Sequence, residues 1–151
     1  DNVTNNDGVS IGSSTLYLDG IKVGDGGQTT GRLNLTVFPT SDFKFNLALF
    51  GADNIFSNIN AEDFDEPDGG NAQLPAYKLF DFGAGYNFDL FGNNAYLRLN
   101  INNVFDEEYY PEMENNYLAT DDSTNYMGIN TANRIFPGWG RTWNVGLTYR
   151  F

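Results

Sequence analysis

The chain has 151 residues, of which 40% are hydrophobic and 16% aromatic, and it includes 17 Gly, 13 Phe and 9 Tyr. This composition is typical of a protein rich in β-strands and turns. The net charge of −12, with eight scattered basic residues, argues against a nucleic-acid partner, because phosphate binding needs clustered Lys and Arg. The absence of cysteine excludes disulfides and thiolate metal sites.

No stretch of the sequence approaches the roughly 20 consecutive apolar residues of a membrane-spanning helix. A spanning β-strand needs only about 9 to 11 alternating residues, and a mean hydropathy of −0.42 does not reveal such strands. The chain opens at Asp1 on a polar stretch without a leader pattern. We therefore expect that a leader was removed or that the chain begins within a longer protein.

Residues 1–27 carry the weakest periodic signal. The apolar residues change phase between Leu18 and Ile21. Residues 14–23 are therefore either a sixth spanning strand or an extracellular hairpin that turns at Asp19-Gly20.

Five later segments alternate apolar and polar residues with a period of two, as strands with two different faces do. They cover residues 32–37, 43–49, 80–88, 96–105 and 142–151. The last is the strongest signal, because all ten positions obey the alternation. The fourth loses phase at Asn103, where we expect a bulge or the end of the apolar zone.

The connections between these segments alternate in length. Residues 39–42 and 91–94 have the composition of tight turns. Residues 55–75 and 110–137 are long, polar and acidic. Outer-membrane barrels have short turns on the periplasmic side and long loops outside the cell, so this pattern predicts a periplasmic C-terminus.

Alternation alone also fits a half-buried sheet in a soluble β-sandwich that binds a ligand. Two features favour a membrane sheet instead. The polar faces hold Asn, Gly, Thr and Arg rather than Lys and Glu, and aromatic residues gather near the strand ends, as in interfacial girdles. A small complete eight-stranded barrel would need two or three more strands than the sequence offers.

The sequence offers few residues for catalysis. Without His or Cys, it cannot form a Ser/His or Cys/His pair of nucleophile and general base. Residues 24–27 lack the Lys and the strand-to-helix setting of a phosphate loop, so we interpret them as a turn. We predict no enzyme, no cofactor and no metal site. The acidic residues of the two long loops could hold calcium, but their irregular spacing favours solvated charge. The first loop holds Glu62, Asp63, Asp65, Glu66 and Asp68, and the acidic residues in or beside the second are Asp106, Glu107, Glu108, Glu112, Glu114, Asp121 and Asp122.

Several aromatic residues in or beside the last long loop are candidates for stacking on a ligand such as a sugar or an aromatic chelate. Residues of a membrane-interface girdle would have the same composition. The candidates are Tyr109, Tyr110, Tyr117, Tyr126 and Trp139.

Three stretches together resemble the end of a TonB-dependent outer-membrane receptor. Residues 99–110, LNINNVFDEEYY, are similar to the penultimate-strand motif of that family, an N-[LV]-F-D pattern followed by charged residues and Tyr. Residues 137–143, PGWGRTW, resemble the segment that opens the last strand. Residues 17–25, YLDGIKVGD, with Gln28-Thr29-Thr30 resemble a stretch of the large barrels.

The resemblance implies an all-β fold, an antiparallel transmembrane β-barrel of 22 strands with an N-terminal plug, in the outer membrane of a Gram-negative bacterium. Such receptors import iron chelates, vitamins or glycans with energy relayed by TonB through the plug. The chain would supply the C-terminal five or six strands, with residues 28–151 as barrel strands and loops, and residues 1–27 as a hairpin or an additional strand.

Five or six strands cannot close a membrane barrel, for which the minimum is about eight. We therefore expect the sheet to be completed by other protein. The remainder of the barrel and plug is the first source and an outer-membrane assembly machine the second. Outer-membrane lipid and a surface lipoprotein are further expected partners.

In the family, a last strand with a terminal aromatic residue is the signal read by the barrel-assembly machinery. By resemblance, this role falls here on one face of the last strand, with Gly146 allowing close backbone approach. Such recognition is strand addition, in which an unpaired edge donates main-chain hydrogen bonds. The apolar members of the signal are Trp143, Val145, Leu147, Tyr149 and Phe151.

Overall fold

The computed structural model describes residues 2–4, 6–8, 10–13, 15–58, 64 and 70–151. This part of the chain is all-β, with antiparallel sheets and no α-helix, so it contains no helix that could cross a membrane. It divides into two compact units. We call residues 28–54, 76–110 and 137–151 the sheet unit, and residues 1–27, 55–75 and 111–136 the loop unit.

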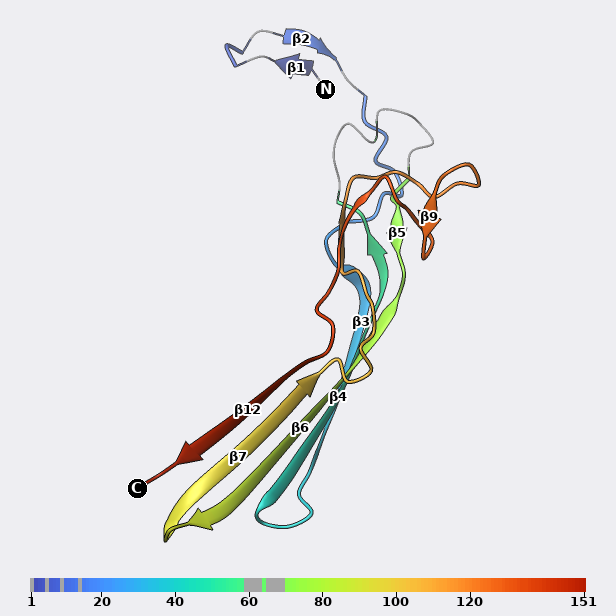
Figure 1. Cartoon of the computed structure of the whole chain (residues 1–151). Coiled ribbons are helices and arrows are strands. Elements are labelled where there is room, and N and C mark those ends of the chain that lie inside the picture. Colours follow the sequence, from blue (N-terminus) through green and yellow to red (C-terminus); the bar gives the residue numbers. More distant parts are fainter. Residues whose placement is uncertain (1, 5, 9, 14, 59–63, 65–69) are drawn as a thin grey trace. The chain divides into compact units, whose positions relative to one another are not determined.

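The sheet unit contains the five predicted strands, which lie side by side in the lower part of Figure 1. Their order is β12-β7-β6-β4-β3, so β12 and β3 form the two edges and the sheet is not closed within the described residues. Several strands are longer than predicted. Their bounds are β3 Gly27–Val37, β4 Phe43–Phe56, β6 Tyr77–Leu90, β7 Asn93–Asn102 and β12 Thr142–Tyr149.

Both predicted tight turns are present. Leu90 pairs with Asn93, which leaves Phe91 and Gly92 as a two-residue hairpin with φ of 54° and 81°. These values match a type I′ turn, whose twist suits antiparallel strands. In the other turn, the Thr40 hydroxyl accepts a hydrogen bond from the Phe43 amide at 3.2 Å.

The predicted strand at 96–105 extends too far. β7 ends at Asn102, and Asn103 adopts a positive φ of 51°. The break therefore falls at the residue where the alternation loses phase. Asn tolerates this left-handed conformation better than other non-glycine residues.

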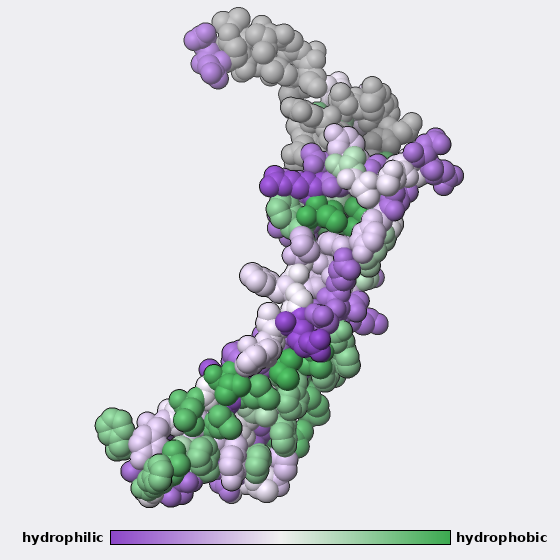
Figure 2. Space-filling model, in the orientation of Figure 1, coloured by the Kyte–Doolittle hydropathy of each residue, from purple (hydrophilic) through white to green (hydrophobic). Residues whose placement is uncertain are grey.

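The strand register places the alternating residues on two faces of different chemistry. One row across the sheet aligns Phe43, Tyr86, Leu97 and Leu147. A second row, on the opposite parity, aligns Asn46, Gly83, Asn100 and Asn144. We call the two sides the apolar face and the amide face. Figure 2 shows hydrophobic residues gathered over the sheet.

The loop unit folds around its own core, although the sequence predicted only long polar connections. Ile55 and Leu74 are 1% exposed and pair across β4 and β5, while Phe64 and Met113 are fully buried. Short strands complete this unit: β1 Asn2–Thr4, β2 Ser10–Ser13, β5 Gln73–Leu74, β8 Glu112–Glu114, β9 Asn125–Tyr126, β10 Ile129–Asn130 and β11 Arg134–Phe136.

Residues 15–24 form no strand, so the sixth-strand interpretation of residues 14–23 is wrong over its described part. The turn at Asp19-Gly20 is present, with φ of 78° at Gly20 and a hydrogen bond from the Ile21 amide to the Leu18 carbonyl. Farther on, a Cβ at Gly24 would lie 2.2 Å from the Ser57 carbonyl oxygen, which explains glycine there. Residues 15–24 are thus a segment of the loop unit without regular secondary structure.

Candidate functional site

The apolar face of the sheet unit is exposed rather than packed. Leu33 on β3, Trp143 and Leu147 on β12 are 68%, 71% and 60% exposed. Complete burial of one such side chain stabilises a protein by roughly 1.5–3 kcal/mol. An exposed face of many large apolar residues is therefore an interaction surface, because soluble monomers rarely leave such patches uncovered.

Exposed aromatic residues mark the turn end of this sheet. Phe38 lies beside the first turn, Phe91 forms the second, and Phe151 ends the chain after β12. Phe91 is 90% exposed and has a positive φ, a conformation that is a genuine outlier for a bulky residue. Its ring contacts no core in the described residues, so this turn combines a strained backbone with an exposed aromatic surface.

The amide face is held together by side-chain hydrogen bonds that cross the strands. The Thr36 hydroxyl donates to Asn46 Oδ1 at 3.0 Å, and Asn100 Nδ2 donates to Asn144 Oδ1 at 2.9 Å. Gly83 lies between the Asn46 and Asn100 amides, and a Cβ there would contact both. Such ladders satisfy polar groups without charge and stiffen the sheet across its width.

The residues of the predicted assembly signal all lie on β12 or directly after it. β12 pairs with β7 from Thr142 opposite Asn102 to Tyr149 opposite Ala95, and its other edge is unpaired among the described residues. Gly146 faces Arg98, whose guanidinium would lie 3.9 Å from an added Cβ. The described packing therefore does not itself require glycine at this position, and the close backbone approach of an assembly partner stays a prediction.

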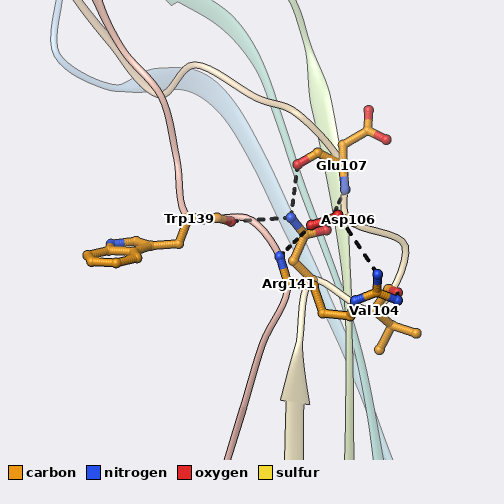
Figure 3. Close-up of polar contacts among 6 residues, drawn as sticks. Val104, Asp106, Glu107, Trp139 and Arg141 are labelled. Atoms are coloured by element: carbon orange, nitrogen blue, oxygen red, sulfur yellow. Dashed lines mark hydrogen bonds and ion pairs between the residues drawn. The ribbon is translucent and has the colours of Figure 1, made fainter.

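The two sequence motifs at the C-terminal end meet in a hydrogen-bonded cluster around Asn103 (Figure 3). Asn103 is 4% exposed. Its Nδ2 donates to the Glu107 carbonyl at 2.9 Å and to the Trp139 carbonyl at 3.3 Å, and its Oδ1 accepts from the Glu107 amide at 2.8 Å. The Asn103 amide itself donates to Asp81 Oδ1 at 2.9 Å. One buried side chain thus joins the exit of β7 to the entry of β12.

Asp106 and Arg141 form the outer part of this Asn103 cluster. The Arg141 amide donates to Asp106 Oδ1 at 2.6 Å, and the Arg141 Nη2 lies 3.8 Å from Asp106 Oδ2. Both side chains are about half exposed, so the ion pair itself contributes little, whereas the amide hydrogen bond fixes the backbone. This hydrogen bond therefore holds the segment that follows β7 next to the segment that precedes β12.

Two of the candidate ligand-contacting aromatics are packed inside the sheet unit. The rings of Tyr109 and Tyr77 are 4.5 Å apart, and a Cβ at Gly138 would overlap the Tyr109 ring. Tyr110 is 6% exposed, and its hydroxyl donates to the Glu108 carboxylate. Glycine at position 138 therefore makes room for Tyr109, and these two rings contribute to packing.

The other three candidate aromatics are exposed but lie in different units. Tyr117 and Tyr126 belong to the loop unit and are 55% and 48% exposed. Trp139 belongs to the sheet unit and is 84% exposed, and Figure 3 shows its indole pointing away from the Asn103 cluster. A ligand-contacting role for these three exposed rings stays a prediction.

The acidic residues do not converge on a metal site in the part of the chain that the structure describes. Glu114 instead pairs with Arg134 across β8 and β11 at 3.0 Å. The acidic run at Glu62, Asp63, Asp65, Glu66 and Asp68 lies outside the described residues.

Sequence reasoning missed the Asn103 cluster as a structural unit. Its signal was the loss of alternation at Asn103 together with the two motifs, but spacing alone does not reveal that segments 36 residues apart exchange hydrogen bonds.

A comparison with known proteins finds no matching protein family, curated protein or solved structure.

Proposed function

We propose that this chain is the C-terminal barrel segment of a TonB-dependent outer-membrane receptor for active nutrient uptake. The observation that carries the proposal is the polarity of the two faces of the sheet. The apolar face is exposed, and side chains of the amide face are joined to one another by hydrogen bonds. This is the arrangement of a barrel wall, apolar toward lipid and polar toward the lumen. The alternating stretch of residues 142–151 meets the roughly 9 to 11 residues that a spanning strand needs.

The two unpaired edges support completion of the sheet by further protein. β3 and β12 each have one strand neighbour among the described residues. Unsatisfied strand edges do not occur in the hydrocarbon region of a membrane, so both must pair in a finished barrel. Under the proposal, β12 pairs with the first strand of the barrel, and its free edge is what the assembly machinery recognises.

A soluble β-sandwich would need a second sheet over the apolar face. Within the described residues no such sheet exists, and Leu147 and Trp143 remain open to solvent. The barrel interpretation accounts for this exposure through lipid, which needs no additional protein layer on that face.

The proposal is tested on the native polypeptide at its full length. We expect an intact mass several times 16.8 kDa, recovery in the outer-membrane fraction, and an unboiled form that migrates differently from the boiled form in detergent gels. Nutrient uptake should be lost in cells without TonB. A stable monomer of 16.8 kDa in plain buffer would contradict the proposal.

A further inference from the structure

The sheet unit contains a cavity of about 350 Å³ at its turn end. Its lining comes from β4 and the turn before it, from β6 and β7, and from the end of β12. All of these residues belong to the sheet unit, every residue of which the structure describes. The volume lies within the range of small-molecule sites, which are typically about 300–1,000 Å³.

The strand register places the polar side chains of this lining on the amide face. Lys44 lies two residues before Asn46 on β4, and Tyr96 pairs with Thr148 across β7 and β12. A Cβ at Gly85 would overlap the Tyr96 hydroxyl oxygen, so this hydroxyl lies over Gly85. Gly85 in turn pairs with Lys44. The Tyr96 hydroxyl is therefore a neighbour of Lys44 on this face.

The lining of the cavity carries more positive than negative charge. It includes the ammonium group of Lys44, the guanidinium group of Arg150 and one carboxylate, that of Asp42. Lys44 is half-buried, and among the described residues neither Lys44 nor Arg150 forms an ion pair. The two cations therefore have no bound counter-ion within the sheet unit.

Two further carboxylates on the amide face are bound to backbone amides. Asp81 Oδ1 accepts a hydrogen bond from the Asn103 amide at 2.9 Å, and Asp89 Oδ1 accepts one from the Gly92 amide at 2.9 Å. Charge-assisted hydrogen bonds of this kind hold each carboxylate in place. The counter-ion of the two cations at the cavity therefore has to come from outside the sheet unit.

We propose that this cavity binds an oxyanion, a phosphate or carboxylate group, between Lys44 and Arg150. Both cationic groups only donate hydrogen bonds, and their bonds to phosphate or carboxylate oxygens are among the strong ones. The hydroxyls of Tyr96 and Thr148 are donors for the remaining oxygens. The site goes beyond the proposed function, because neither nutrient uptake nor completion of the sheet requires an anion here.

The first test is isothermal calorimetry with inorganic phosphate, on the full-length protein in a non-ionic detergent at low ionic strength. A free oxyanion as the ligand predicts saturable binding. Lys44→Gln and Arg150→Gln should each weaken it at least about tenfold, because each removes a charge-assisted hydrogen bond. Lys44→Arg keeps the charge and should stay within about threefold of the wild type.

Lys78→Gln is the matched control, because Lys78 is a lysine of the same unit that does not line the cavity. Its affinity for phosphate should stay within about twofold of the wild type. Gel mobility without boiling should show that every variant is folded.

The second test covers the case in which a carboxylate of the same full-length protein occupies the site and blocks phosphate. A carbodiimide then couples the Lys44 amine to that carboxylate, and peptide mass spectrometry identifies the residue. Coupling to a carboxylate outside the cavity supports the proposal, as phosphate binding does.

Three results would overturn the proposal. They are coupling of Lys44 to Asp42 alone, phosphate binding that Lys78→Gln weakens as much as Lys44→Gln does, and the absence of both binding and coupling. TonB-dependent uptake is measured separately, so the anion site and the receptor function can each fail alone.

Discussion

Residue 103 has to adopt a backbone conformation with positive φ, and its side chain has to form hydrogen bonds. The positive φ of Asn103 favours Gly or Asn, whereas the three hydrogen bonds of its amide group can come only from Asn. The side chain is almost completely buried. Asparagine is the residue that meets both demands.

Replacement of Asn103 should separate these two demands. Asn103→Ala removes the hydrogen bonds and adds backbone strain, so we expect a loss of about 3 kcal/mol in the free energy of unfolding. Asn103→Gly removes only the hydrogen bonds and should cost about 1 kcal/mol less. Urea unfolding in detergent micelles measures both, with Asn87→Ala on β6 as the exposed control. An Asn103→Gly variant less stable than Asn103→Ala would contradict the role of the backbone.

The two faces of β12 make opposite predictions for neighbouring positions. Leu147→Arg places a charge on the apolar face near mid-strand, where we expect a loss of roughly 2–4 kcal/mol if that face meets lipid. Thr148→Arg places the same charge on the amide face and should cost far less. Unfolding in lipid vesicles provides the measurement. Equal losses in the two variants would refute the assignment of the faces.

Among the elements, β12 depends on the Asn103 cluster for its starting point. Between Asn102 and Thr142 the chain makes a long excursion through the loop unit, and then pairs directly across from where it left. A slip by one residue would exchange the two faces of the strand. The hydrogen bond from the Arg141 amide to Asp106 therefore helps to fix the register of β12.

We expect Asp106→Ala to reduce hydrogen-exchange protection at the start of β12 by about tenfold, because it leaves the Arg141 amide without its acceptor. Arg141→Gln keeps that amide and removes only a half-exposed ion pair, so protection should fall by less than about threefold. Amide exchange followed by mass spectrometry compares the two. A larger effect from Arg141→Gln would assign the register to the ion pair instead.

The strands were predictable from the sequence because their alternation is a local property. The residues of β12 and β6 follow a period of two, and the hairpin at Phe91-Gly92 follows from turn composition. The core of the loop unit was not predictable, since Phe64 and Met113 are single apolar residues within polar sequence. Likewise, the sequence places Tyr109 and Tyr110 beside a loop without indicating that they are packed. The contact of Tyr109 with Gly138 and the burial of Tyr110 are visible only in the tertiary structure.

At the scale of the whole molecule, the two tryptophans test how the sheet meets a bilayer. Trp139 lies beside the Asn103 cluster and Trp143 lies within the apolar face. Under the proposed function, Trp143 should lie deeper in lipid than Trp139, which should lie at the interface. Trp143→Phe and Trp139→Phe each leave one of these two fluorophores, in a protein whose tryptophans outside the 151 residues are replaced by Phe.

Vesicles of lipids brominated at shallow or deep acyl positions quench the two single-tryptophan variants according to depth. We expect shallow bromines to quench Trp139 more strongly, and the ratio to shift toward deep bromines for Trp143. Failure of both lipids to quench Trp143 would rule out lipid contact by the apolar face.

The core of the loop unit is assembled from three segments that are far apart in the chain. The Tyr17 amide donates to the Phe64 carbonyl, and the Asn58 amide donates to the Met113 carbonyl. Contacts of such long sequence separation form slowly unless intervening chain is already ordered, because loop closure costs entropy. The hairpins of the sheet supply that order by bringing the ends of neighbouring strands together. We therefore expect the burial of Phe64 and Met113 to be a late event in folding, which follows the pairing of the strands that lead into these segments.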